Sequence, residues 1–315
     1  MNYYKRTADA LLKDLLDAFG AVLIEGPKWC GKTTTASQLA NSILRMQDPS
    51  MRDEYLVTAK TKPSILLNGD TPRLIDEWQD APMLWDAVRT TVDDRQIPGQ
   101  FILTGSNAVD KSQIHHSGAG RITRLRMLPM SLWESKESTG EVSLKELFNN
   151  PDYDIDGKMS KMSIEDLIFA ASRGGWPASL LARTPKAQLL VAKNYVQTIC
   201  LDDISGIDGK RRDAKLTSMI LRAYARNVST LVKKKSLIDD VISSGEVSCH
   251  TDTFDDYVSA LEKLFVIQNV SAWCPAIRSK TAIRSSVKRC FCDPSIPIAL
   301  LGLSPEALSM QLKTF

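Results

Sequence analysis

The chain has 315 residues, of which 43% are hydrophobic and 24% charged, and its formal net charge is +3. This composition excludes a disordered or collagen-like chain, and the length is sufficient for two domains. No apolar run approaches the roughly 20 residues that cross a bilayer, and the N-terminus is charged and amphipathic, unlike a signal peptide. The six cysteines are scattered, as is typical of reduced thiols. We therefore expect a cytoplasmic protein.

A glycine-bounded loop follows the first expected strand, Ala21–Glu25. The segment Gly26–Thr33 matches the pattern G-x-x-x-x-G-K-[ST] without a mismatch. A helix is expected over residues 32–44, and residues 43–46 are a candidate second strand. In this pattern the glycines bring backbone N–H groups close to phosphate oxygens, Lys32 reaches the β- and γ-phosphates, and the Thr33 hydroxyl can ligate Mg²⁺. We expect the nucleotide to be bound by Gly26, Pro27, Lys28, Trp29, Cys30, Gly31, Lys32, Thr33 and Thr34.

Two acids end the next clearly apolar strand, at Asp76 and Glu77. An isolated Asp-Glu pair is often a solvated turn, but this pair follows a buried strand downstream of a phosphate loop. There Asp76 can hold Mg²⁺ together with Thr33, directly or through water. Glu77 can orient and deprotonate a water molecule that attacks the γ-phosphate.

The last two expected core strands contribute the remaining candidates. At the end of the strand over residues 100–107, Thr104, Ser106 and Asn107 can place a hydroxyl or amide near the acids, or can simply cap the strand. Arg121 precedes the strand over 122–127 and can reach a γ-phosphate of its own subunit or of a neighbouring one. The alternative for Arg121 is a surface ion pair. The catalytic candidates are Lys32, Glu77, Ser106 and Arg121.

The alternation of strands and helices predicts an α/β fold, a doubly wound parallel sheet of the P-loop NTPase type, with ligands at its C-terminal edge. We expect this core to span residues 1–135 and a polar linker or lid to span 136–163. A helical domain is expected over 164–292. The remainder, 293–315, contains an apolar run, Ile298–Leu303, for which we expect little packing.

The helical domain shows the plan of a winged helix. Helices are expected near residues 216–228, 236–243 and 253–264, followed by strands over 265–270 and 288–292. Its basic segment Lys210–Lys235 and its acid-free loop Arg278–Arg289 could contact DNA. Acidic residues on the third helix oppose that interaction, so the alternative is a protein-interaction or lid role.

Five segments together resemble a large group of prokaryotic AAA+-type ATPases, which join an ATP-binding core to a C-terminal domain of unknown function with a winged-helix part. These segments are GPKWCGKTTTA, LIDEWQ, GQFILTGS, HSGAGRITRLRMLPMSLWES and RGGWP. The resemblance implies that Gly26–Thr33 bind ATP as a Walker A loop and that Asp76 and Glu77 form the Walker B pair. It also implies that Ser106 ends a sensor-like strand and that Arg121 is an arginine finger.

Relatives in this group usually continue past a segment like Asp293–Ile296 into a nuclease-like region, so we expect a truncated chain here. The leading hypothesis is an ATPase that uses ATP and Mg²⁺ to move its C-terminal module. If Arg121 acts in trans, the protein must form a homo-oligomer. The alternative is a nucleotide-gated DNA-binding or adaptor protein with negligible turnover. A small-molecule kinase would need an acceptor pocket that the sequence does not identify.

Overall fold

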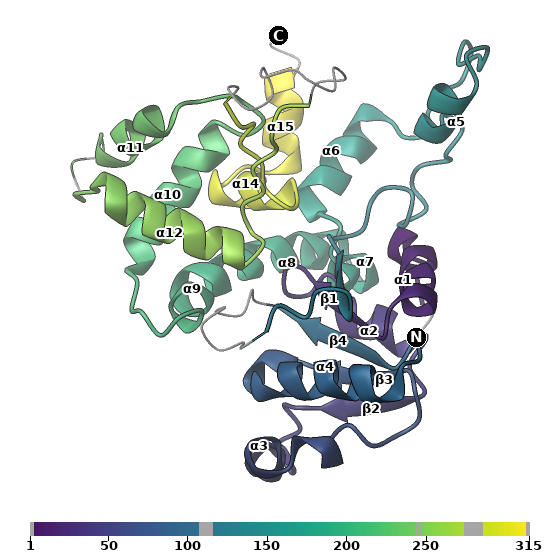
Figure 1. Ribbon diagram of the computed structural model, residues 1–315. Coiled ribbons are helices and arrows are strands. Elements are labelled where there is room, and N and C mark those ends of the chain that lie inside the picture. The colour runs from purple at the N-terminus through teal and green to yellow at the C-terminus, as the bar shows by residue number, and fades with distance from the viewer. Residues whose placement is uncertain (1–2, 107–115, 244, 246, 274–285, 313–315) are drawn as a thin grey trace.

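A five-stranded parallel sheet forms the centre of the N-terminal half in the computed structural model, which describes residues 3–106, 116–243, 245, 247–273 and 286–312. The strand order is β2-β3-β4-β1-β5 (Figure 1). Strand β4 is central, and β1 lies between β4 and the edge strand β5. All neighbouring strands pair in parallel, which confirms the predicted α/β fold class. The strands are β1 (Ala21–Glu25), β2 (Ser42–Arg45), β3 (Arg73–Asp76), β4 (Phe101–Gly105) and β5 (Ile122–Arg126).

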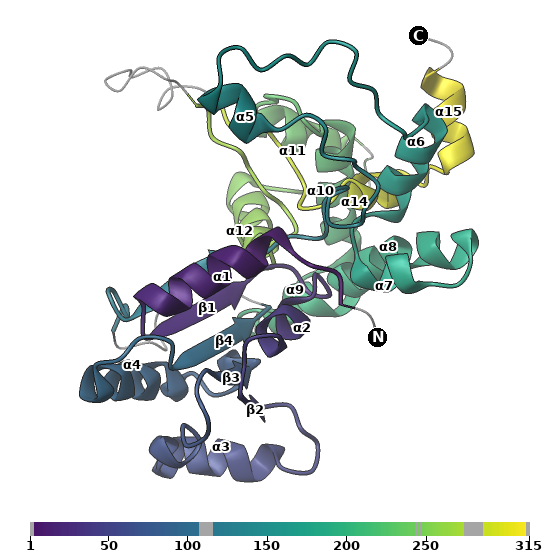
Figure 2. The same cartoon turned by 90° about the vertical axis from the view of Figure 1, so that its right-hand side faces the viewer.

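Helices cover both faces of this sheet (Figure 2). Because side chains alternate along a strand, Val22 and Ile24 of β1 pack with Leu12 on one face, while Leu23 packs with Trp85 on the other. The first face is covered by α1 (Thr7–Ala18) and α2 (Lys32–Ser37). The second is covered by α3 (Arg52–Thr61) and α4 (Met83–Arg95), with short 3₁₀ turns at η1 (Pro63–Ile65) and η2 (Trp78–Asp80).

The helix after the phosphate loop is shorter than predicted. It ends at Ser37, and the chain then enters β2 at Ser42, so the expectation of a helix over residues 32–44 is wrong. Leu44 is buried in the sheet core, where β2 pairs with β3. Burial of this strand residue outweighs the local helical pattern, which three consecutive threonines already weaken.

The C-terminal half forms a second hydrophobic core, centred on Trp176, Ile220, Phe254 and Leu261. Ile296 and Leu300 belong to the same core, so the expectation that the last apolar run has little to pack against is wrong. The helices are α6 (Ile164–Arg173), α7 (Pro177–Leu181), α8 (Pro185–Thr198), a π-helical turn η4 (Ile199–Asp203), α9 (Ile204–Gly206), α10 (Ala214–Arg226), α11 (Lys234–Ile242), α12 (Thr251–Lys263), α14 (Ser295–Leu300) and α15 (Pro305–Leu312).

Helices α10, α11 and α12 lie close to their predicted positions. After them the chain makes two antiparallel bridges, Ile267 with Phe291 and Val270 with Lys288, where a hairpin was expected. The assignment as a winged helix stays a prediction, as do the predicted domain limits. Of the expected basic loop Arg278–Arg289, residues 278–285 lie outside the described part of the chain.

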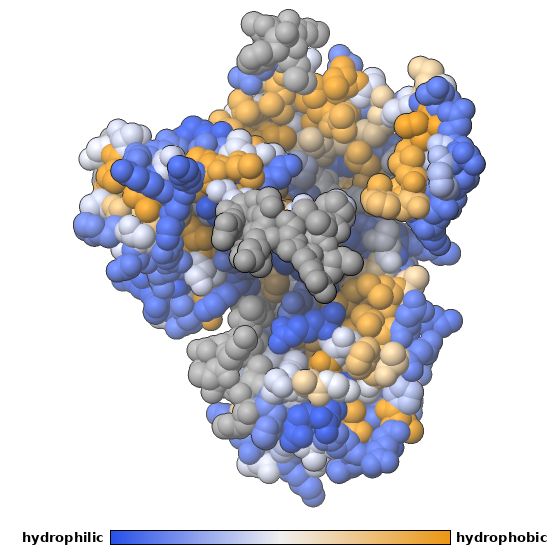
Figure 3. All heavy atoms as spheres, turned by 45° about the horizontal axis from the view of Figure 1, so that its top comes forward, coloured by the Kyte–Doolittle hydropathy of each residue, from blue (hydrophilic) through white to orange (hydrophobic). Residues whose placement is uncertain are grey.

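Helix α5 (Leu144–Asn149) stands apart from both cores, and none of its six residues is buried (Figure 1). Apolar side chains of this helix, including Leu144 and Phe148, are exposed. Figure 3 shows that hydrophobic residues form several separate patches on one face of the molecule. Among the described helices, none combines the length and the apolar composition that crossing a bilayer requires.

Candidate functional site

The phosphate loop folds tightly between β1 and α2. Gly26 and Gly31 have φ angles of +155° and +99°, and a Cβ at Gly26 would lie 2.0 Å from the carbonyl oxygen of Met127. Only glycine fits there without strain. The Lys32 ammonium is buried and donates to the carbonyls of Gly26 (3.0 Å) and Pro27 (2.8 Å).

Asp76 connects the phosphate loop to two strands of the sheet. Its Oδ1 atom accepts hydrogen bonds from the Thr33 hydroxyl (2.7 Å) and the Thr104 hydroxyl (2.6 Å). The parallel register places Asp76 beside Thr104, and the loop follows β1 on the other side of β4. The C-terminal ends of three strands thus bring these groups together at one edge of the sheet.

The carboxylate of Glu77 lies at the same edge and is held by two neighbours. Ser106 donates from its hydroxyl at 3.3 Å to Glu77 Oε2, and the Gln79 side-chain amide donates to the same oxygen. Glu77 itself has a φ of +56°, a left-handed conformation that is uncommon for a non-glycine residue and often marks a functional site. The buried Oε1 of Gln79 has no hydrogen-bond partner among the described residues.

The oxygens at this edge suit a hard cation. Thr33 Oγ1 and Asp76 Oδ1 are only 2.7 Å apart, and hydroxyl and carboxylate oxygens are the ligands that Mg²⁺ prefers. Mg²⁺ usually keeps several waters and takes the rest of its ligands from phosphates, so it needs few protein ligands. Within the part of the chain that the structure describes, no cluster of three or more His, Cys, Asp or Glu forms a metal cage.

A cleft of about 1440 Å³ opens between this edge and the helical half. Glu77 and Ser106 line it, together with the apolar surface of α7 and α8. The loop residues in its wall are Lys28, Trp29, Gly31, Lys32, Thr33 and Thr34. The structure therefore brings most of the predicted nucleotide-binding residues to one cavity.

Three loop residues do not line the cleft, and Cys30 shows why. Gly26 and Pro27 are buried, and the Cys30 side chain packs in the core between the sheet and α1. Burial raises the pKa of the Cys30 thiol, so this thiol stays neutral. The Cys30 carbonyl accepts from Arg6 at 2.7 Å. Any phosphate contact from Cys30 must therefore come from its backbone N–H.

Arg121 lies at the wrong end of the sheet to act on a nucleotide of its own subunit. Its carbonyl accepts from the Ala21 N–H at the start of β1, whereas the phosphate loop follows the end of that strand, about 16 Å away. Its guanidinium is exposed and pairs with Asp93 at 2.7 Å. This topology contradicts the expected role of Arg121 in the nucleotide site of its own subunit. A role of Arg121 toward a neighbouring subunit stays a prediction.

The basic segment Lys210–Lys235 is partly neutralised within the protein. Arg212 is buried and pairs with Asp208 and Asp256, while Lys210 also pairs with Asp256. Arg226 and Lys234 have acidic partners as well. These pairs weaken the electrostatic argument for DNA, because paired cations release fewer counterions on binding a phosphate backbone.

Sequence reasoning missed the contacts between the phosphate loop and the helical half. Lys28 pairs with Asp203 at 2.6 Å. The Trp29 ring lies 5.4 Å from that of Tyr195, which lies 4.3 Å from the buried Trp176. The motif RGGWP contains Trp176, but no spacing in the sequence signals its neighbours. The role of Gln79 was also missed, although it ends the motif LIDEWQ.

Comparisons with known proteins identify two matching domain models and a similar fold. Residues 18–136 match the family model of an AAA domain, and residues 164–307 match that of a domain of unknown function, DUF8612. A similar solved structure is the Walker-type ATPase PABY2304 of Pyrococcus abyssi, with a TM-score of 0.56, 14% identity, and coverage of 95% of this chain and 96% of that one. The fold and the match to the AAA-domain model support ATPase-like nucleotide binding.

In particular, the N-terminal part of the chain matches the AAA-domain model and the C-terminal part matches the DUF8612 model. Two similar proteins are the uncharacterized proteins Mb2031c of Mycobacterium bovis and Rv2008c of Mycobacterium tuberculosis. Each is 24% identical over 309 residues, which are 95% of this chain and 60% of the relative. The chain thus spans about 60% of the length of these curated relatives. The winged helix and the missing nuclease-like end remain predictions.

Proposed function

We propose that this protein binds ATP with Mg²⁺ in the cleft and hydrolyses it, and that the nucleotide shifts the helical half relative to the core. The observation that carries the proposal is the contact between the loop hydroxyl of Thr33 and Asp76 at 2.7 Å, with Glu77 in the wall of the same cleft. A phosphate loop, a metal-holding acid and a second acid are the parts that ATP hydrolysis needs.

The loop would hold the triphosphate. The backbone N–H groups around Gly31 and the Lys32 ammonium supply positive charge to the β- and γ-phosphates. Lys32 would leave the carbonyls of Gly26 and Pro27, which are 3.0 and 2.8 Å from it, for phosphate oxygens. Thr33 and Asp76 would hold Mg²⁺, which supplies positive charge against the β- and γ-phosphates.

Glu77 would act as the general base. It accepts a proton from the attacking water, the water oxygen bonds to the γ-phosphorus, and the bond to the bridging oxygen breaks, which releases ADP and inorganic phosphate. Ser106 and Gln79 hold the Glu77 carboxylate through hydrogen bonds. Lys32 stabilises the negative charge on the transferring phosphoryl group.

The base of the nucleotide would lie against the helical half. Leu181 of α7 and Leu190 and Val191 of α8 line the cleft with apolar surface, and Asn194 adds an amide. Trp29 presents a ring from the loop side. An aromatic ring, apolar side chains and a few polar groups are typical of small-molecule sites, whose usual volumes of about 300–1,000 Å³ fit within this cleft.

Two loop residues support a conformational response. Lys28 contacts Asp203, and Trp29 contacts Tyr195. Two adjacent residues of the phosphate loop therefore contact the helical half. A phosphate that draws Lys28 away from Asp203 breaks one of these contacts. A change of this kind at a hinge between two packed units is a common nucleotide switch.

The test is ATP binding and Mg²⁺-dependent phosphate release by purified protein, compared with Lys32→Ala and Glu77→Gln. We expect turnover by the wild type, binding without turnover by Glu77→Gln, and loss of binding by Lys32→Ala. Binding by the wild type with turnover no faster than Glu77→Gln would contradict hydrolysis and favour a nucleotide-gated adaptor. Absence of binding by the wild type would contradict the proposal as a whole.

A further inference from the structure

We propose that Arg6 is a positioning residue of the nucleotide site. It contacts the phosphate loop on the side away from the cleft and holds the loop in a conformation that can bind phosphate. Glu134 in turn holds Arg6 in place. This inference rests on the proposed function. Arg6 precedes the residues that match the AAA domain, which begin at 18. The segment that contains Glu134, in the motif SLWES, has no role in the hydrolysis described above.

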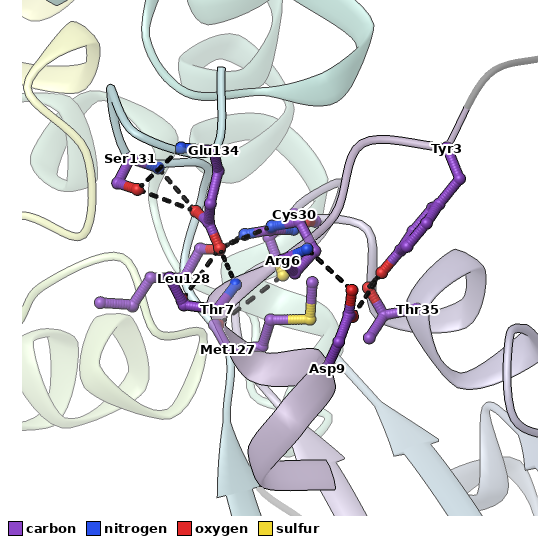
Figure 4. Close-up of polar contacts among 10 residues, drawn as sticks. All are labelled: Tyr3, Arg6, Thr7, Asp9, Cys30, Thr35, Met127, Leu128, Ser131 and Glu134. Carbon is purple, nitrogen blue, oxygen red and sulfur yellow. Dashed lines mark hydrogen bonds and ion pairs between the residues drawn. The ribbon is translucent and has the colours of Figure 1, made fainter. Parts of the chain in front are cut away.

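Arg6 uses its whole guanidinium group in the protein interior (Figure 4). Only 8% of the residue is exposed. Its Nη1 donates to the Cys30 carbonyl at 2.7 Å, its Nη2 to the Leu128 carbonyl at 2.7 Å, and its Nε to Glu134 at 3.1 Å. One side chain therefore links the start of α1, the phosphate loop and the segment that follows β5.

The surroundings of Glu134 stabilise its negative charge beside Arg6. Thr7 donates to its Oε1 from the backbone (2.7 Å) and the hydroxyl (3.0 Å), and Ser131 donates to its Oε2 from the same two groups (2.8 and 3.2 Å). Burial by itself would raise the pKa of Glu134, but these hydrogen bonds and the charge of Arg6 outweigh burial and lower the pKa. The pair stays ionised, and its partners satisfy the buried charges.

The geometry of one peptide explains how Arg6 acts on the nucleotide. In a trans peptide the C=O and the following N–H point in opposite directions. Because Arg6 draws the Cys30 carbonyl inward, the N–H of Gly31 points outward, and Gly31 lines the cleft. Without Arg6 this peptide can turn over and present a carbonyl oxygen to the phosphate, which is repulsive.

The same N-terminal segment also holds the far side of the loop. The Tyr3 hydroxyl donates to Asp9 at 2.6 Å and lies 3.0 Å from the Thr35 hydroxyl in α2 (Figure 4). Asp9 in turn accepts from the Arg6 backbone N–H at 2.9 Å. Residues 3–9 therefore contact the loop at Cys30 and the helix that follows it at Thr35.

The experiment measures the Kd for ATP, the kcat and the melting temperature of full-length Arg6→Lys and Glu134→Gln. Lysine keeps the charge but cannot reach three acceptors at once. Hydrogen bonds to charged groups are strong enough that we expect the Kd for ATP to rise about tenfold in each variant. The kcat should change less than about twofold, because the loop contacts phosphate in both ground and transition states. Lys5→Met, a neighbouring exposed cation, is the matched control and should bind like the wild type.

The outcomes separate this inference from the proposed function. Wild type that fails to bind ATP overturns the proposed function. A wild type that binds ATP, with both variants folded and binding equally well, overturns only the role of Arg6. A fall in melting temperature with unchanged Kd assigns Arg6 to stability and also overturns it. If Arg6→Lys fails to fold, Glu134→Gln decides the question, because it keeps the Arg6 side chain and removes only the negative charge that holds it.

Discussion

The ammonium group of Lys28, in the phosphate loop, lies 2.6 Å from a carboxylate oxygen of Asp203, in the π-helical turn after α8. The Asp203 side chain is only 9% exposed, whereas that of Lys28 is 38% exposed. The next loop residue, Trp29, packs on Tyr195 of the same helical half. The loop that we propose to hold phosphate is therefore in direct contact with the domain that we propose to move.

Lys28→Met should uncouple the helical half from the nucleotide. A phosphate that competes with Asp203 for Lys28 changes the turn at residues 199–203 only when the lysine is present. We expect ATP to alter hydrogen exchange in that turn in the wild type and to alter it several-fold less in the variant. Lys186→Met, an exposed lysine of α8, is the control. An equal response in the Lys28 variant would contradict this coupling.

Thr104→Val should weaken the use of Mg²⁺. The substitution keeps the shape of a buried strand residue but removes the hydroxyl that donates to Asp76 at 2.6 Å. One hydrogen bond of about 1 kcal/mol corresponds to a factor of about five, so we expect a similar increase in the Mg²⁺ concentration for half-maximal phosphate release. Thr123→Val on β5 is the control, and an unchanged Mg²⁺ dependence in Thr104→Val would argue against a metal-holding Asp76.

Gly175→Ala should destabilise the junction between the core and the helical half. A Cβ at residue 175 would lie 2.0 Å from the carbonyl oxygen of Met130 and 2.7 Å from its nitrogen, and the two backbones must separate. We expect a loss of about 2–4 kcal/mol in the free energy of unfolding, measured with urea. Gly206→Ala is the comparison, because a Cβ there would meet no atom of the described residues within 4 Å. A similar loss in Gly206→Ala would show that the contact with Met130 is not the cause.

Stability should fall in acid partly through Asp208. Hydrogen bonds from Arg212 lower the pKa of Asp208 from 3.8 to about 2. The contribution is therefore complete above pH 4 and is lost as the pH falls toward 2. Because the carboxylate is partly solvent-screened, we expect Asp208→Asn to cost about 1 kcal/mol at pH 7. The difference from the wild type should shrink as the pH falls from 4 through about 2, and a difference that does not shrink over this range would contradict the ion-pair explanation.

Arg121 tests whether a neighbouring copy completes the site. The sheet topology keeps Arg121 away from its own nucleotide, so Arg121→Ala should leave the Kd for ATP unchanged. If a second copy supplies this arginine, phosphate release per subunit rises with protein concentration in the wild type and stays low in the variant. A rate per subunit that is independent of concentration would contradict a role in trans.

Local patterns predicted the parts of the site that lie next to one another in sequence. The segment Gly26–Thr33, the acids Asp76 and Glu77, and Ser106 were all identified from strands that end in polar residues. These residues come together because the C-terminal ends of parallel strands meet at one edge of the sheet, and the structure places all of them at that edge. Arg121 was correctly expected to precede the strand over 122–127, but in a parallel sheet the start of that strand lies at the edge opposite the phosphate loop.

Short-range spacing and strand burial were enough to predict the α/β core, the phosphate loop and the acid pair, because each of these is written into a few neighbouring residues. Which distant side chains meet became visible only once the chain was folded. Arg6 reaches Cys30 and Glu134 across 24 and 128 residues, and Lys28 reaches Asp203 across 175. No periodicity encodes such pairs, since they arise from how packed helices and strands bring separate segments together.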